Sequence, residues 1–127
     1  MSKHTATWKK EPSKDEYEAA LGYLSLQLPT AEAQRLVRTA RRIVPTQRIA
    51  KDVLRASRLP LVPSDERHVA EDLKKIRKGK PLAPVILIQG DLLRGRHPII
   101  ADGYHRMCAA CHADEDAPVV LVLVPVR

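Results

Sequence analysis

A short polar turn between two apolar segments carries the residue types best suited to ligand binding. It follows the apolar residues 99–101 and precedes the alanine-rich residues 107–112. A helix that begins here leaves its first backbone N–H groups unpaired and partly positive, so the turn predicts an anion site. A glycine allows a tight turn, an arginine can hold phosphate through two hydrogen bonds, and a histidine can donate another. The turn reads Asp102-Gly103-Tyr104-His105-Arg106.

Two alternatives stay open for this turn. In the first, His105 and Arg106 only cap the helix and pair within a folded turn. In the second, the chain transfers or hydrolyses phosphate; Asp102 is then the catalytic candidate that positions a metal or nucleophile, and Arg106 stabilises charge. Whether there is turnover is not decided by the sequence, which shows no Ser–His–Asp set, HExxH, Walker loop or GxGxxG pattern.

The order of elements around the turn resembles the ParB/sulfiredoxin superfamily over residues 64–124. The matching stretches are residues 82–86, which hold Pro84 ahead of a strand, residues 100–110, and residues 118–121. The resemblance implies a nucleotide ligand, namely ATP, ADP or CTP with Mg²⁺, or another phosphorylated small molecule. It also implies that Pro84 and residues 102–106 bind that ligand. Tyr104 stands where sulfiredoxins have their reactive cysteine, and no separate helix-turn-helix follows as in ParB proteins, so neither specific activity is expected.

The two cysteines belong to a stretch with the spacing of a c-type haem attachment site, Cys108-Ala109-Ala110-Cys111-His112. On a helix, residues three apart share one face, so we expect two small buried thiols rather than haem ligation. A redox pair at a helix start is an alternative. Zinc ligation by both cysteines with His112 or His105 lacks a second ligand pair, so the sequence predicts no metal site. His68 and His97 are expected to be isolated and exposed.

The net charge of +7 is concentrated in residues 30–58, which contain eight basic residues and only two acidic ones, Glu32 and Asp52. Two predicted helices, 30–44 and 47–57, each carry a basic face. This pattern predicts a DNA-binding accessory protein, with a helix-turn-helix-like pair on the phosphates, as the second functional hypothesis. A solvated face or an acidic partner would give the same pattern. The nucleic-acid candidates are Arg35, Arg38, Arg42, Arg48, Lys51 and Arg55.

The apolar periodicity predicts an α+β fold, with N-terminal helices packed on a small mixed β-sheet. Residues 1–14 predict a flexible tail in which Trp8 could dock on the body, and residues 15–127 predict one domain. Its basic helical part covers residues 15–63, and its ParB/sulfiredoxin-like core covers residues 64–127. The predicted elements are helices 15–28, 30–44, 47–57 and 64–78, strands 85–89 and 98–101, helix 104–113 and strand 118–124.

Composition sets the remaining expectations. The longest apolar run is shorter than the roughly 20 residues that cross a bilayer, and no export signal is evident. We therefore expect a cytoplasmic protein, bacterial in type, without a membrane partner. The oligomeric state is open, and a structural or interaction domain without a working site is the third hypothesis.

Overall fold

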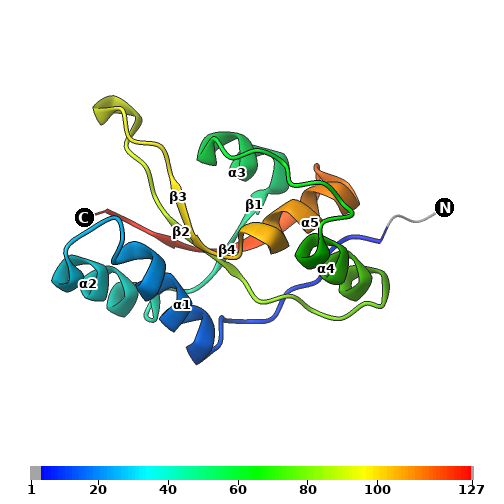
Figure 1. The fold of residues 1–127 in the computed structure, drawn as a ribbon, viewed down its shortest axis with the longest axis horizontal. Coiled ribbons are helices and arrows are strands. Elements are labelled where there is room, and N and C mark those ends of the chain that lie inside the picture. The colour runs from blue at the N-terminus through cyan, green and yellow to red at the C-terminus, as the bar shows by residue number, and fades with distance from the viewer. Residues whose placement is uncertain (1–3, 127) are drawn as a thin grey trace.

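The computed structural model describes residues 4–126 of the chain, and within that range five α-helices pack on a four-stranded mixed sheet (Figure 1). The α+β class predicted from the sequence is therefore confirmed. A single 3₁₀ turn within that range, Leu92–Arg94, lies in the hairpin between the second and third strands. The elements are α1 (Lys14–Leu24), α2 (Thr30–Ala40), β1 (Thr46–Ile49), α3 (Ala50–Ser57), α4 (Arg67–Arg77), β2 (Val85–Ile88), η1 (Leu92–Arg94), β3 (Ile99–Asp102), α5 (Tyr104–Asp114) and β4 (Pro118–Val124).

The strands follow the order β1-β4-β2-β3 across the sheet. The two central strands, β2 and β4, run parallel, while each edge strand is antiparallel to its neighbour. All four residues of β2 are buried. Its Val-Ile-Leu-Ile sequence suits a strand covered on both faces, because branched apolar side chains pack well on a pleated surface.

Alternate residues of the central strands meet different helices. Ile86 and Val122 join one core with α1 and α2, while Val85 and Leu121 join another with α3 and α5. The helices therefore cover both faces of the sheet, α1 and α2 on one side and α3 and α5 on the other (Figure 1). α4 packs on α5 through Val69.

The predicted helix from residue 47 is wrong at its beginning. Thr46–Ile49 form the edge strand β1, paired with β4, and the helix begins at Ala50. The N–H groups of Ala50 and Lys51 donate to Ala117 O and Glu115 O, so the loop before β4 takes up two donors of the first turn. Because the pairing partner of β1 is β4, far along the chain, the local sequence does not indicate this strand.

Three other helix boundaries also differ from the prediction. α1 ends at Leu24 rather than residue 28, and α2 ends at Ala40 rather than residue 44. α4 begins at Arg67, with Glu66 as its N-cap, and not at Ser64. A carboxylate accepting from a first-turn N–H serves the same purpose as the predicted hydroxyl.

The segment before α1 is part of the folded body over residues 7–9 and is not the predicted flexible tail there. Leu82 N donates to Thr7 O and Lys9 N donates to Leu82 O, both at 2.8 Å. Trp8 packs against the cores on the α5 side of the sheet, so its predicted docking is confirmed. Residues 1–3 of the predicted tail lie outside the described residues.

Among the helices described in residues 4–126, none combines the length and the apolar character required to cross a bilayer.

Candidate functional site

The predicted strand–glycine–helix turn is present. β3 ends at Asp102, Gly103 is the N-cap residue, and α5 begins at Tyr104. Gly103 has φ +101°, a left-handed conformation that L side chains rarely adopt. A Cβ at this position would also lie 2.7 Å from Arg106 Nη2. The turn therefore requires glycine for two separate reasons.

Arg106 is a structural anchor of this turn. Its Nε donates to Ala83 O at 3.0 Å, and its Nη2 donates to Pro84 O at 3.3 Å and to Asp102 Oδ2 at 3.0 Å. The side chains of Arg106 and Asp102 are only 18% and 16% exposed. Most of the guanidinium is thus committed within the protein, and Nη1 is left without a hydrogen-bond partner in the described part of the chain.

Asp102 is the ion-pair partner of Arg106. Burial raises the pKa of its carboxyl group, and the positive charge and hydrogen bond of Arg106 oppose that rise. The carboxylate therefore stabilises the turn in this arrangement. Pairing within the turn, one of the two alternatives from the sequence, therefore applies to Asp102 and Arg106. The catalytic role of Asp102 stays an untested prediction.

The sequence-predicted ligand residue Pro84 does not line the cavity beside the turn. Its side chain is fully buried, and its carbonyl oxygen accepts from Arg106. Pro84 therefore helps to orient Arg106 through its carbonyl oxygen. The predicted role of Pro84 in ligand binding stays a prediction, and this cavity does not include its side chain.

A polar cavity of about 290 Å³ lies beside the turn, between α4, α5, the segment before β2 and the chain near Lys9. All five residues of the predicted turn, Asp102 to Arg106, line this cavity. No side chain caps the N-terminus of α5, and no partner is found for the N–H groups of residues 104–106 within residues 4–126. These donors give the turn side of the cavity a partial positive charge.

The side chains around the cavity carry both signs of charge. Lys9, Lys75 and Arg106 stand against Glu16, Glu71, Asp72 and Asp102, and two histidines add to the wall. Lys75 Nζ lies 3.9 Å from Asp72 Oδ1. Burial raises the pKa of Asp72, against the attraction of Lys75. Such a wall can bind a bare anion only weakly, but it suits an anion that brings its own cation.

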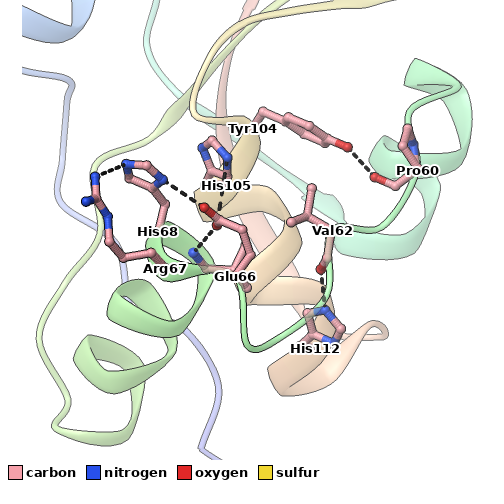
Figure 2. Close-up of polar contacts among 9 residues, drawn as sticks. Pro60, Val62, Glu66, Arg67, His68, Tyr104, His105 and His112 are labelled. Carbon is pink, nitrogen blue, oxygen red and sulfur yellow. Dashed lines mark hydrogen bonds and ion pairs between the residues drawn. The ribbon is translucent and has the colours of Figure 1, made fainter.

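The Tyr104 side chain points toward Pro60, away from His105 and His68 (Figure 2). This hydroxyl donates to Pro60 O, and in the last turn of α5 the ring of His112 lies 2.7 Å from Val62 O. The two contacts hold the extended connector between α3 and α4 along α5. Tyr104 therefore lines the cavity with its ring and positions the connector with its hydroxyl.

Glu66, His68 and His105 form a cluster that the sequence did not predict (Figure 2). Glu66 Oε1 lies 2.9 Å from His68 Nδ1, and Glu66 Oε2 lies 3.9 Å from His105 Nε2. The ring centroids of the two histidines are 4.8 Å apart. The predicted isolation of His68 is therefore wrong, although its predicted exposure is confirmed. Glu66 and His105 lie far apart in the sequence, and only the contact of α4 with α5 brings them together.

Glu66 is held in place before any ligand is considered. Its Oε2 accepts from Val69 N at 2.9 Å as the cap of α4. This backbone hydrogen bond, together with the one from His68, lowers the pKa of Glu66 to about 2. The cluster therefore contains a firmly oriented, ionised carboxylate beside two imidazoles.

The two cysteines are free and buried, as predicted for small core residues. Burial raises the pKa of the Cys108 thiol and raises that of Cys111 to about 11. Both thiols are therefore protonated at neutral pH. A protonated, enclosed thiol is a poor nucleophile, which argues against the redox alternative.

The six nucleic-acid candidates do not share one surface on a helix pair. Arg35 and Arg38 belong to α2 and Arg42 follows it, whereas Lys51 and Arg55 belong to α3, on the other face of the sheet. The predicted helix-turn-helix arrangement is therefore wrong, and Arg48 lies on β1 rather than on a helix.

Three of these six side chains have partners within the chain. Arg35 Nη2 lies 2.9 Å from Glu32 Oε2, and Lys51 Nζ lies 2.6 Å from Asp116 Oδ1. Arg48 Nη1 donates to Thr46 Oγ1 at 3.0 Å. The basic excess predicted from the sequence is thus divided between two faces and partly paired.

Comparison of this chain with family models, curated proteins and solved structures found no match. The ParB/sulfiredoxin resemblance consequently depends on the residue pattern of residues 64–124, and the site has to be interpreted from its own chemistry.

Proposed function

We propose that the chain binds a small phosphorylated ligand, such as a nucleotide, in the cavity before α5. The observation that carries this proposal is the uncapped N-terminal turn of α5, whose N–H groups adjoin a polar cavity. Helix N-termini of this kind are suited to phosphate because the donors and the helix dipole act together. Lys9 and Lys75 add positive charge on the same wall.

The ligand is expected to bind as its Mg²⁺ complex. Asp72 and Glu71 place carboxylates on the cavity wall, and Mg²⁺ commonly takes one or two carboxylates together with phosphate oxygens. The cation would offset the repulsion between these carboxylates and the phosphate. This arrangement explains why acidic and basic side chains meet around one cavity.

The size of the cavity limits how much of the ligand is enclosed. A volume of about 290 Å³ lies just below the range for ligand pockets, about 300–1,000 Å³. The phosphates would be enclosed and the nucleoside would extend over the surface. ATP, ADP and CTP are therefore all reasonable probes.

The DNA-binding hypothesis has weaker support. Its basic side chains lie on both faces of the sheet and three of them are paired, so they do not form one strip of positive charge. If DNA is nevertheless the ligand, its affinity will fall steeply with salt, as expected for phosphate contacts.

Titration calorimetry with ATP, ADP, CTP and inorganic phosphate, each with and without Mg²⁺, tests the proposal. Lys9→Ala and Lys75→Ala should each weaken phosphate binding several-fold, because both side chains line the cavity. Lys10→Ala and Lys74→Ala remove the neighbouring charges outside the cavity and should leave binding unchanged. Failure of all four ligands to bind, or equal effects of the four variants, would reject the site.

A further inference from the structure

The cluster of Glu66, His68 and His105 contains the ligand types of a transition-metal site. Imidazole nitrogens and carboxylate oxygens are common ligands of Zn²⁺, and three protein ligands with an open fourth position are a recurrent zinc arrangement. The three donor atoms lie within 4.8 Å of one another in the absence of an ion. We propose that Glu66, His68 and His105 bind one divalent transition-metal ion, with Zn²⁺ as the expected species.

The distances fit an ion once the side chains adjust. Ligands at 2.0–2.2 Å from a tetrahedral zinc ion lie about 3.4 Å from one another. Glu66 Oε1 and His68 Nδ1 are 2.9 Å apart, and Glu66 Oε2 and His105 Nε2 are 3.9 Å apart. These two distances involve different oxygens of the Glu66 carboxylate. With one ligand atom per residue, all separations lie within 4.8 Å, so the atoms must approach one another by up to about 1.4 Å. Such movements are within the reach of side-chain rotation.

The backbone positions of the three ligands are fixed by packed helices. Glu66 caps α4, and His68 and His105 are each the second residue of their helix. α4 and α5 are joined by a buried core that contains Val69 and Cys108. Metal binding therefore immobilises few additional groups, which lowers the entropic cost of forming the site.

Two existing contacts of His68 change when the ion binds. His68 Nδ1 hydrogen-bonds to Glu66, and Arg67 Nη2 lies 3.4 Å from His68 Nε2. An ion on Nδ1 replaces the proton there, and Nε2 then carries the proton in the neutral ring. Arg67 is exposed and can turn into solvent, so this rearrangement costs little.

The local charge favours a site of moderate strength. The partial positive charges at the N-termini of α4 and α5 oppose a cation, while the ionised carboxylate of Glu66 favours one. His68 and His105 also line the cavity that holds Glu71 and Asp72. The ion would thus lie at the rim of the cavity, with its open position available to water or to a ligand.

Calorimetric titration of the untagged chain with Zn²⁺ tests this site. One ion should bind per chain, and His68→Ala and His105→Ala should each reduce the affinity at least about ten-fold. His97→Ala, which removes a histidine outside the cluster, is the matched control and should not change it. Glu66→Gln keeps an oxygen that can cap α4 and removes the charge, so it should weaken binding without unfolding the chain.

Co²⁺ as a spectroscopic probe distinguishes this site from the cysteines. Ligation by two imidazoles and a carboxylate gives visible cobalt absorption without a thiolate-to-cobalt charge-transfer band. Far-UV circular dichroism without metal confirms that each variant is folded. A thiolate band, no binding of Zn²⁺, or affinities unchanged in both histidine variants would overturn the proposal.

The metal proposal and the phosphate proposal can fail separately, although both include His105. Zn²⁺ binding is measured without phosphate, and Lys9→Ala should leave it unchanged. Phosphate binding is measured with Mg²⁺, and Glu66→Gln, at a residue that does not line the cavity, should affect it much less than Lys75→Ala. Each proposal thus has a variant on which the other does not depend.

Discussion

The guanidinium group of Arg106 lies against Gly103, so a Cβ at residue 103 would come 2.7 Å from Nη2 and 3.1 Å from Cζ. The same guanidinium is held by Ala83 O, Pro84 O and Asp102. The absence of a side chain at residue 103 is what allows Arg106 to connect the end of β3 with the segment before β2. The turn is therefore a packing unit as well as a candidate ligand site.

Replacing Gly103 should destabilise the fold. In Gly103→Ala the left-handed backbone costs about 1–2 kcal/mol, and displacement of Arg106 adds to it, so we expect a loss of more than 2 kcal/mol. Urea unfolding measures this free energy. Gly95→Ala also has a positive φ, +70°, but open space for the Cβ, so it reports the cost of a left-handed backbone without a contact with Arg106.

Gly22→Ala is the control substitution, which should raise the unfolding free energy instead of lowering it. Gly22 lies within α1 and a Cβ there would meet nothing within 4 Å. Alanine should stabilise the helix by about 0.5–1 kcal/mol. If Gly103→Ala behaved like Gly22→Ala, the described packing of Arg106 against the turn would be incorrect.

The ion pair of Asp102 with Arg106 should show strong energetic coupling. Removing either partner leaves a largely buried charge unpaired, and each single alanine variant should lose about 3 kcal/mol of unfolding free energy. The double variant should lose less than the two single losses together, by about 1–2 kcal/mol. A double-mutant cycle by urea unfolding measures this difference, and additive losses would contradict the pairing.

The two thiols should be unreactive in the folded protein. Cys108 is fully buried and Cys111 is 8% exposed, and burial raises the pKa of both. A chromogenic disulfide reagent at neutral pH should modify them slowly, and in urea it should modify both rapidly. Rapid labelling of the native chain would show that the thiols are accessible.

Cys111 should also make stability fall in alkaline solution. The folded pKa is about 11 and the ordinary value is 9.0, so between these pH values the unfolded thiol releases its proton first. Because the folded state then binds more protons, the unfolding free energy declines as pH rises through this window. Cys111→Ala should decline less steeply over the same range, and equal slopes would argue against the raised pKa.

The segment around Trp8 should contribute to the stability of the fold. Trp8 packs on the core beside α5, and its neighbours Thr7 and Lys9 hydrogen-bond to Leu82. Trp8→Ala should lower the unfolding free energy by about 3 kcal/mol, as for other large-to-small changes at packed aromatics. Circular dichroism during urea unfolding measures the loss. Lys10→Ala should have little effect, and a Trp8→Ala variant as stable as the parent would show that the segment is dispensable.

The second half of the fold could be predicted from local sequence because its signals are local. Each of three local features indicates one element: the apolar run of β2, the glycine before α5 and the apolar run of β4. The turn at residues 102–106 also lies between a strand and a helix, as the sequence predicts. The sequence did not indicate that Arg106 turns back to bind Asp102 and two carbonyl groups, since these partners are known only once β2 and β3 are paired.

The features that escaped prediction all depend on distant partners. β1 is four residues long and mostly polar, and its pairing is with β4. Glu66 and His105 come together through the packing of α4 on α5. The basic residues of α2 and α3 looked continuous along the chain, but the sheet separates the helices that carry them.

The strand order β1-β4-β2-β3 also has a kinetic consequence. Both β1 and β2 have β4 as a neighbour, although β4 follows them in the chain, so their pairing waits for the synthesis of residues 118–124. Contacts between such distant segments slow folding because a large loop must close first. During synthesis, α1 and α2 are therefore made well before the sheet can be completed, whereas only residues 103–117 separate the β2–β3 hairpin from β4. Until β4 is in place, β2 lacks its parallel neighbour, and α1 and α2 lack a complete sheet to cover.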